Sequence, residues 1–418
     1  MSNQVDKTLD YKLKSTSKSH YKMTRILQQT GGETVNMTGN GTTSVFEIPP
    51  VVHNWARSVL EFDVKYAELN TKRVFIFRDT LPIQRVEIIN RGGVSLMDVV
   101  NFQNFINATS PLETDIKTYR GSQATNDFLY PTDSLTDLTP VELTVGAAGD
   151  GAGAGDITIN YRIDLGKIKN TILSLDKSLY VGEHLNLRIT WSNSADIGFT
   201  ADDGAGTTPV TYAGNMTVSK LRLHLAQEGD EAVAQEIMAS ASQMQILIPY
   251  TWSYKTNLQG KSQALSLRFG VGHGQTLERV YNAFYTTAEE KNTRYNRPLN
   301  HVDSFYTLLN NRRMQEFDYS TADHDVYNLK RDYAEGYVAG LTRGIYETSF
   351  CYVEDWCGGH HNCAINNEVS GLPLTGAEVK WDLFCQSAGG GGTNLNHYTF
   401  AVCQRVLTVS AAAGVQIA

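Results

Sequence analysis

Several features that would assign this 418-residue chain to a membrane or secreted class are missing. No apolar run approaches the roughly 18–20 residues that a membrane-spanning helix needs. The first residues, MSNQVDKTLDYKLKSTSK, contain no apolar core of a secretory signal, so we expect no signal peptide. Hydrophobic residues make up 41% and charged residues 19%, a balance that excludes a disordered chain. The length then allows two domains of ordinary size.

Cysteine is scarce and unevenly placed. All five cysteines lie in the last 70 residues: Cys351, Cys357, Cys363, Cys385 and Cys403. An odd number confined to one region fits a disulfide framework poorly, so we expect reduced thiols in a cytosolic fold.

Catalytic signatures are missing as well. The sequence contains no H-E-x-x-H, no G-x-x-x-x-G-K-[ST] and no G-x-S-x-G. Gly270, Gly272 and Gly274 follow a predicted strand, but no third glycine of a dinucleotide fingerprint and no helix come after them. We interpret this segment as a bulge or tight turn. We therefore expect neither enzymatic activity nor a cofactor.

One short segment has metal-ligand chemistry. The segment is CYVEDWCGGHHNC, residues 351–363, and its candidate ligands are Cys357, His360, His361 and Cys363. Zinc prefers tetrahedral nitrogen and sulfur ligands, and the Cys-x2-His spacing is acceptable. The His361-x-Cys363 spacing is tight, because structural sites usually join two ligand pairs across a longer span. A metal site and an ordinary loop with reduced thiols both remain open, and the spacing favours the loop.

Alternation of apolar and polar residues is what the sequence has in abundance. Together with 35 Gly and 21 Tyr, it indicates antiparallel strands joined by tight turns. Residues 277–285 have helical spacing but are rich in β-branched and aromatic residues, so a strand is favoured there. Many strands with few helices favour sandwiches or barrels over βαβ units. The alternating segments are 60–66, 157–165, 185–191, 221–225, 246–248, 265–269, 379–383 and 398–402.

Two helices are predicted from their end signals. Ser110 and Pro111 supply an N-cap and a first helical residue, and Gly121 would end that helix. The second helix would run from a cap at Thr321 or Asp323 to Gly336.

The order of these elements is similar in the two halves. The strand at 60–66 is matched with 265–269, the helix near 111 with that near 323, 157–165 with 345–353, and 185–191 with 379–384. Offsets near 200 residues suit a duplicated domain, with a seam in the Ala-rich stretch 228–242. We therefore predict an arm over 1–40, a first unit over 41–228, and a second over 229–418 that includes a C-terminal tail.

Charge separates the start of the chain from the rest. The first 30 residues carry six bases and two acids, leaving +4 there and −12 elsewhere. Such a leader is typical of a segment that contacts an anionic partner, although a solvated terminus explains it equally well. The candidate contact residues are Lys7, Lys12, Lys14, Lys18, Lys22 and Arg25.

Two stretches resemble a known family. Residues 157–191, ITINYRIDLGKIKNTILSLDKSLYVGEHLNLRITW, and the end, VKWDLFCQS followed by a glycine loop and NHYTFAVCQRVLTVSAAAGVQI, are similar to segments of double-jelly-roll major capsid proteins of the tectivirus–adenovirus lineage. The resemblance implies an all-β fold of two tandem eight-stranded antiparallel jelly rolls with short inserted helices. The Cys/His segment is not a feature of that family.

The resemblance also implies a function. Such a chain would be a major capsid protein that trimerises into pseudo-hexagonal capsomers and builds an icosahedral shell, being made inside the host cell and residing in the virion. Its partners would be itself, neighbouring capsomers, and minor capsid and vertex proteins. Loops at 122–156 and 192–216 would face outward, and the basic arm would face internal membrane lipid or genome.

Two alternatives remain open at this point. One is a tandem β-sandwich that binds or acts on carbohydrate, because jelly rolls also host lectins and glycan enzymes. The other is a minor capsid or vertex protein of the same virus.

Overall fold

The structure is a computed structural model. It describes residues 20–29, 34–37, 42–67, 74–77, 81–113, 142–145, 156–193, 199–201, 209–210, 215–241, 245–258, 262–268, 275–286, 290, 302–309, 312–313, 316, 319–320, 351–357, 369–374, 380–387, 395–410 and 414–417.

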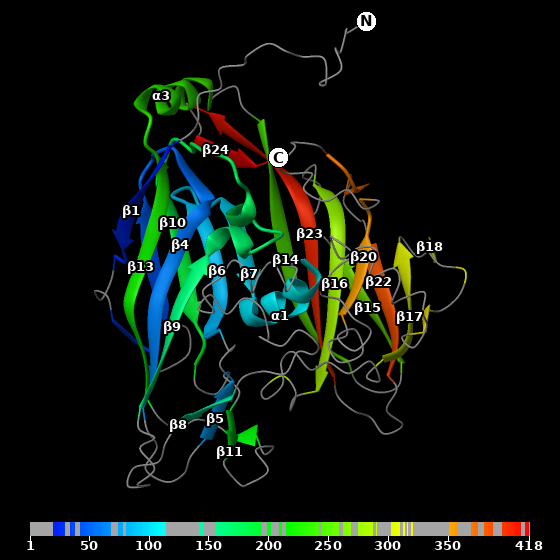
Figure 1. The fold of residues 1–418 in the computed structure, drawn as a ribbon. Helices are drawn as coiled ribbons and strands as arrows, with labels where there is room; N and C mark the ends of the chain where they lie inside the picture. The colour runs from blue at the N-terminus through cyan, green and yellow to red at the C-terminus, as the bar shows by residue number, and fades with distance from the viewer. Residues whose placement is uncertain are drawn as a thin grey trace, which may run out of the picture.

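The N-terminal half forms two facing antiparallel sheets (Figure 1). The first, named here the β4 sheet, has the order β1 (Tyr21–Leu27), β13 (Met216–Glu228), β4 (His53–Tyr66) and β9 (Ile157–Asp164), with β2 (Val35–Asn36) also paired to β13. The second, the β6 sheet, has the order β3 (Thr43–Ile48), β10 (Leu185–Trp191), β6 (Ile83–Asn90) and β7 (Ser95–Val100). Helix α1 (Phe102–Glu113) follows β7, and two 3-10 turns, η2 (Leu165–Lys167) and η3 (Ile172–Ser174), follow β9.

The C-terminal half repeats this arrangement. Its β16 sheet has the order β14 (Gln245–Leu258), β23 (Leu395–Ser410), β16 (Thr276–Thr286) and β20 (Cys351–Asp355), with β21 (Leu372–Pro373) on β16 and β24 (Gly414–Ile417) on β23. Its β17 sheet has the order β15 (Ser262–Arg268), β22 (Lys380–Ser387), β17 (Val302–Leu309) and β18 (Arg312–Arg313), with β19 (Tyr319–Ser320) on β17. Helix α3 (Glu231–Ser240) connects the halves.

The same strand order recurs in both halves. If the eight main strands of each half are numbered along the chain, one sheet reads first, eighth, third, sixth and the other second, seventh, fourth, fifth. This order places sequence-distant strands side by side in two facing sheets, which is the arrangement of a jelly roll. We call the two halves the first and second rolls.

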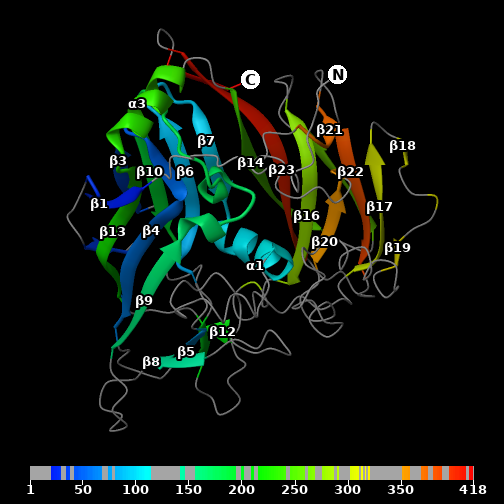
Figure 2. The ribbon, with the colours of Figure 1, turned by 45° about the horizontal axis from the view of Figure 1, so that its top comes forward.

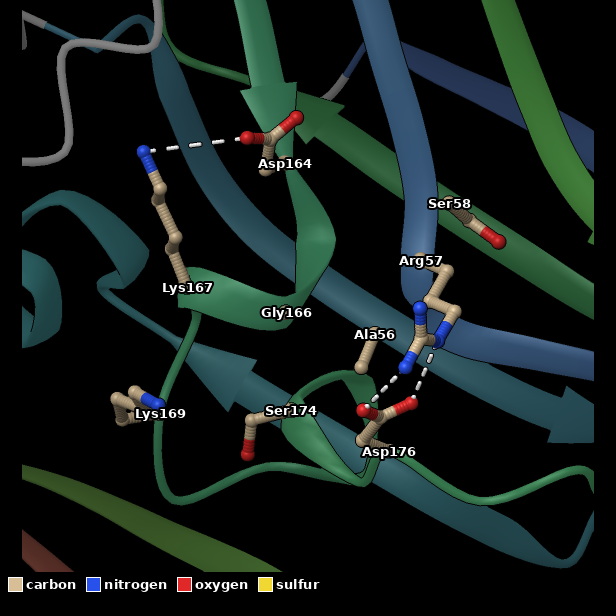
Figure 3. A pocket seen from close by; sticks show the side chains of 9 residues that line it. All are labelled: Ala56, Arg57, Ser58, Asp164, Gly166, Lys167, Lys169, Ser174 and Asp176. Carbon is tan, nitrogen blue, oxygen red and sulfur yellow. Dashed lines mark hydrogen bonds and ion pairs between the residues drawn. The ribbon is translucent and has the colours of Figure 1, made fainter. Parts of the chain in front are cut away.

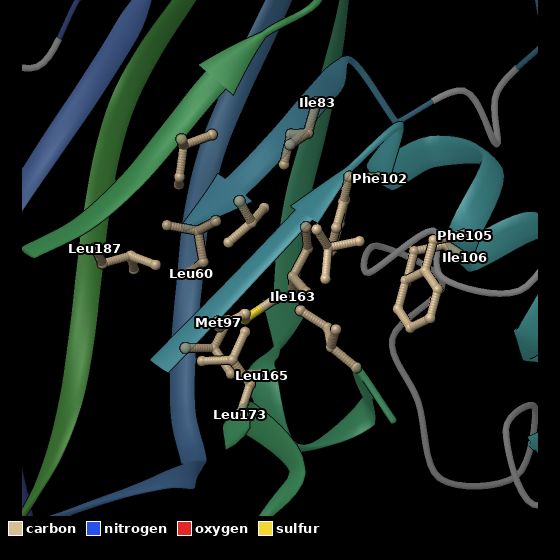
Figure 4. Packing of buried hydrophobic residues seen from close by; sticks show 14 of the residues in the cluster. Leu60, Ile83, Met97, Phe102, Phe105, Ile106, Ile163, Leu165, Leu173 and Leu187 are labelled. Carbon is tan, nitrogen blue, oxygen red and sulfur yellow. The ribbon is translucent and has the colours of Figure 1, made fainter. Parts of the chain in front are cut away.

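Each roll has its own aromatic and aliphatic interior. In the first roll Phe62 stacks on Tyr161 at 4.8 Å between ring centroids and meets Trp191 edge-on at 5.1 Å. Figure 4 shows Leu60, Met97 and other apolar side chains between the two sheets and α1. The alternation read from the sequence is confirmed in β10, where every second residue is buried, as in Leu185 and the positions after it.

A third, smaller sheet stands at one end of the molecule. It has the order β12 (Pro209–Val210), β11 (Phe199–Ala201), β5 (Val74–Phe77) and β8 (Glu142–Val145), and it lies below both main sheets of the first roll in Figure 1. β8 lies within 122–156, and β11 and β12 lie within 192–216. The two loops that the sequence singled out therefore meet in one sheet.

The opposite end of the molecule contains the start of β1, here called the chain entry, together with β24 and helix α3, which connects the two rolls. Tyr21 pairs with Glu228, directly before α3, and β24 pairs with the last residues of β23 (Figure 1). The main chain of His20 accepts a hydrogen bond from Gly229 N at 2.5 Å. Asp230 caps α3, since its side chain accepts hydrogen bonds from the backbone of Ala232 and Val233.

Some sequence predictions are corrected by the structure. β1 and β2 lie inside the range 1–40 assigned to an arm, and β1 is the first main strand of the first roll. The strand containing 60–66 is the third main strand of its roll, so its counterpart is β16, and the match with 265–269 was wrong. Residues 277–285 do form a strand, β16. The predicted helix 323–336 and the glycines at 270–274 lie outside the described residues.

The first helix was also misplaced. Observed α1 ends at Glu113, so Ser110 and Pro111 lie in its last turn instead of its first. The cause is burial: Phe102, Phe105 and other α1 residues pack into the core, and this tertiary gain outweighs a local capping signal.

Candidate functional site

A polar hollow opens beside the first roll (Figure 3). Its volume is about 490 Å³, and β4, η2 and the segment around η3 surround it. The lining residues are Ala56, Arg57, Ser58, Asp164, Gly166, Lys167, Lys169, Ser174 and Asp176.

Two ion pairs lie in this hollow. Arg57 donates two hydrogen bonds, each 2.9 Å long, to the two carboxylate oxygens of Asp176, and Lys167 lies 3.9 Å from Asp164. Burial alone would raise the pKa of Asp176, but hydrogen bonds from Arg57 and Asn54 lower it overall. The hydrogen bond between Arg57 and Asp176 also raises the pKa of Arg57.

The hydroxyls of the hollow are committed to the backbone. Ser58 Oγ donates to Asn54 O at 2.7 Å and accepts from Ala226 N at 3.0 Å. Ser174 Oγ donates to Thr171 O at 2.9 Å. Neither serine has a base within the hydrogen bonds that the structure gives it, so the hollow offers structural pairing instead of an activated nucleophile.

The predicted metal residues fall mostly outside the described part of the chain. Only Cys357 is described, and His360, His361 and Cys363 are not. The Cys357 thiol is buried and donates to Ser370 O at 3.4 Å. Within the described residues, no group of three or more His, Cys, Asp or Glu side chains could hold a metal ion. The metal site thus stays a prediction.

The structure describes two of the six basic residues that were predicted to contact an anionic partner. Lys7, Lys12, Lys14 and Lys18 lie outside the described residues, whereas Lys22 and Arg25 are exposed residues of β1. Residues three apart in a strand point to opposite faces, so Lys22 and Arg25 do not share one surface. Arg25 lies opposite His224 of β13.

Comparison with known proteins gives a structural match and no sequence match. No protein-family model matches the chain, and the search of curated proteins finds no match. The PBCV-1 virus capsid protein superposes with a TM-score of 0.58 at 12% identity, covering 98% of this chain and 99% of that one. The Faustovirus major capsid protein gives 0.57 at 9% identity, with 97% and 93% covered, and the mavirus major capsid protein gives 0.52 at 9%, with 100% and 95% covered. These neighbours are double-jelly-roll capsid proteins.

The fold is a double jelly roll. At such low identity the match establishes the fold, and it agrees with the repeated strand order.

The junction of this double jelly roll is a continuous core. Ring centroids of Phe105 on α1 and Phe400 on β23 are 5.3 Å apart in an edge-on arrangement, and Figure 2 shows α1 between the two rolls. Residues of both rolls belong to one apolar cluster, which includes Tyr281, Phe400 and Val402 from the β16 sheet. The opposite face of that sheet, with Val280 and Phe284, builds the second roll's own interior.

Polar contacts fix how the rolls meet. Asn170, between η2 and η3, donates to Tyr281 Oη at 3.1 Å and accepts from Arg279 at 3.2 Å, while its carbonyl accepts from Thr251 at 2.7 Å. Its φ of 60° is left-handed, a conformation that asparagine tolerates better than most residues. Near the β7 edge, Arg405 lies 3.4 Å above the Tyr250 ring and donates to the first roll's backbone at 3.3 Å.

These junction residues escaped sequence reasoning. Asn170 and Phe105 look like ordinary loop and helix residues, because their partners lie more than 80 positions away. The only local signal was an asparagine within a polar connection, which permits a left-handed turn.

Within the described residues, no helix is both long and apolar enough to cross a membrane.

Proposed function

We propose that this chain is a viral major capsid protein that trimerises into pseudo-hexagonal capsomers and builds an icosahedral shell in the virion. The observation that carries the proposal is the double jelly roll itself, matched over nearly the full length of both chains by viral capsid proteins. A trimer of two-roll chains offers six similar blocks around a ring, which suits hexagonal tiling.

The fused core supports a structural role. Because the rolls share one apolar cluster, each chain is a rigid two-block unit and not two tethered domains. In the hollow, Arg57 is paired with Asp176, and the hydroxyls of Ser58 and Ser174 donate to backbone carbonyls, an arrangement that also favours assembly over catalysis. We propose a non-enzymatic function, with neighbouring capsomers and minor capsid and vertex proteins as partners.

The two ends of the molecule suggest its orientation in a shell. The small sheet of β5, β8, β11 and β12 stands at one end, while chain entry, α3 and β24 lie at the other. We propose that the small-sheet end faces outward and the other end inward. Residues that precede His20 then start on the inner side, where Lys7, Lys12, Lys14 and Lys18 would meet anionic lipid headgroups or genome phosphates.

The assembly proposal is tested on purified full-length chain. Light scattering should give three times the 46.3 kDa chain mass, and negative-stain images should show hexagonal outlines. A stable monomer that binds glycans would contradict the proposal and favour the carbohydrate-binding alternative.

The arm proposal needs a deletion that spares β1. Removing residues 2–30 would also remove β1 and so damage the first roll. Removing residues 2–19 leaves that strand intact, as does replacing Lys7, Lys12, Lys14 and Lys18 by alanine. We expect trimers to form normally but filled particles to be lost, and normally filled particles would contradict the inward basic arm.

A further inference from the structure

A lysine, a glutamate and an asparagine meet at one corner of the second roll. Lys255 lies near the end of β14, and Asn396 is the second residue of β23. Glu290 follows β16 in the chain and contacts both of them. One of its carboxylate oxygens accepts a hydrogen bond from Lys255 Nζ at 3.0 Å, and the other accepts one from Asn396 Nδ2 at 2.5 Å. A single carboxylate therefore holds the amine beside the amide.

Strand pairing places these two nitrogen-bearing side chains on the same face of the sheet. In the antiparallel pair of β14 and β23, Lys255 lies opposite Tyr398, and Asn257 lies opposite Asn396. Lys255 and Asn396 are thus diagonal neighbours, because residues two apart in a strand share a face. Diagonal neighbours lie about 7–8 Å apart, a span that a lysine side chain can bridge.

Buried groups support the carboxylate from one side. Tyr398 is 1% exposed and donates its hydroxyl to the same Glu290 oxygen that Lys255 binds. Its ring centroid lies 5.1 Å from Lys255 Nζ, a cation–π contact, and the ring packs edge-on against Tyr285. Asn396 is 9% exposed, so its amide is largely removed from water. The Lys255 side chain is 43% exposed, which leaves a path to solvent for a departing group.

The amide carbonyl has a hydrogen-bond donor of its own. Asn257 Nδ2 lies 3.4 Å from Asn396 Oδ1. A donor in this position stabilises the negative charge that develops on a carbonyl oxygen during nucleophilic attack. The corner therefore combines an amine nucleophile, a carboxylate that can accept and return protons, an amide electrophile and a donor for the oxyanion.

A similar cluster on the first roll lacks these supports. Asp63 accepts a hydrogen bond from Asn160 at 2.6 Å, and Lys220 Nζ lies 2.7 Å from its other oxygen. Asn160 is exposed, and among the described residues no donor contacts its amide oxygen. Water competes for each of these groups, so we expect only ion pairing and hydrogen bonding there.

We propose that Lys255 and Asn396 condense into an intramolecular isopeptide bond, with Glu290 as the proton carrier. Lys255 Nζ forms a bond to Asn396 Cγ, the Cγ–Nδ2 bond breaks, and ammonium leaves. Two of the three Nζ protons pass through the Glu290 carboxylate to Nδ2, and the carboxylate is regenerated. The reaction needs no oxidant, reductant or co-reactant. It does not depend on the capsid function proposed above.

The bond fastens the edge strand of the β16 sheet. β14 is the outermost described strand of that sheet and is paired with β23 alone. The bond also encloses β15 to β22 in one covalent ring, because these strands lie between residues 255 and 396. A cross-link that closes so long a loop restricts the unfolded chain. The second roll is thereby protected against separation of its first and last main strands.

Intact mass spectrometry of the purified, denatured full-length chain measures the condensation. The wild-type chain should be lighter than the unlinked chain by about 17 Da, the mass of ammonia. Proteolysis should yield a branched peptide that joins Lys255 to Asn396, and no branched peptide that joins Lys220 to Asn160.

Two variants test the roles of the amine and the carboxylate. Lys255→Arg keeps the positive charge but lacks the attacking amine, and Glu290→Gln keeps the size of the side chain but cannot carry the proton. Both should retain their full unlinked mass, with far-UV circular dichroism spectra like that of wild type.

Loss of ammonia has a second chemical source that the test must separate. An asparagine can cyclise on its own backbone, and Asn40 followed by Gly41 is a candidate for this reaction. Lys255→Arg blocks the isopeptide bond and leaves such cyclisation unchanged. A wild-type chain of full mass, or a loss that persists in Lys255→Arg, would overturn the isopeptide bond. A branched peptide that forms as readily in Glu290→Gln would overturn the role of Glu290.

Discussion

Truncation of Phe105 to alanine should destabilise both rolls together. Phe105 is fully buried on α1, and its ring meets Phe400 of the second roll at 5.3 Å. Replacing a buried phenylalanine by alanine costs about 3–5 kcal/mol of unfolding free energy. The edge-on pair itself accounts for about 0.5–1.5 kcal/mol of that loss.

Equilibrium urea unfolding of both proteins at one fixed chain concentration measures this cost. Tryptophans report on both rolls, since Trp55 and Trp191 belong to the first and Trp252, Trp356 and Trp381 to the second. With a shared core, wild type and Phe105→Ala should each unfold in one transition, the variant at lower urea.

A double-mutant cycle separates the junction from simple loss of a core residue. Phe105→Ala with Phe400→Ala should show a coupling of about 0.5–1.5 kcal/mol. Phe46 is equally buried inside the first roll, and Phe46→Ala with Phe400→Ala should be additive within about 0.5 kcal/mol. Two separate transitions in wild type, or zero coupling between Phe105 and Phe400, would refute the reasoning.

Three further predictions concern the buried histidines, a close backbone approach at Gly166 and the contact of Arg405 between the rolls. Burial lowers the pKa of His53 to about 4 and of His397 to about 3, so the unfolded chain takes up protons from about pH 6.5 downward while the folded chain does not. The free energy of unfolding should therefore fall as the pH drops below 6.5, by about 2 kcal/mol per histidine at pH 5. Urea titrations at several pH values should show a weaker pH dependence of this free energy in His397→Gln. An unchanged pH dependence in that variant would contradict the prediction. Gly166→Ala should lower the melting temperature, because the added Cβ would collide with a backbone carbonyl of β4 at a cost of about 1–3 kcal/mol. Gly92→Ala should leave the melting temperature unchanged, because the nearest neighbour of its added Cβ is a side-chain atom at 3.4 Å. Arg405→Ala should lower the free energy of unfolding by about 2–3 kcal/mol, because it removes both the stacking on Tyr250 and the hydrogen bond to the first roll's backbone. A loss below about 0.5 kcal/mol, the usual effect of a surface substitution, would show that this contact does not stabilise the fold.

Strands were predictable because one-sided burial imposes a period of two. The segments 185–191 and 157–165 coincide with β10 and β9 almost residue for residue. Even the ambiguous 277–285 followed its β-branched and aromatic content, although both faces of β16 are buried. A strand covered on both sides loses the alternation that usually reveals it.

Contacts that depend on the third dimension were not predictable. The helical signal at Pro111 competed with burial of Phe102 and Phe105, and burial prevailed. The basic leader was read as a single arm, yet Arg25 lies in a main strand because its neighbour Ile26 packs against the core. Among the candidate site residues, the structure separates Lys22 from Arg25 and shows Cys357 with ordinary backbone partners.

The clustering of chain entry, α3 and β24 at one end has a consequence for engineering. In the proposed orientation, a protein fused at either terminus would be carried into the lumen of the particle as cargo. A peptide inserted between β11 and β12 would instead be displayed on the particle surface, as an antigen would need to be. Packaging and display would thus use separate ends of one chain, and both modifications could be combined without touching the strands that join the two rolls.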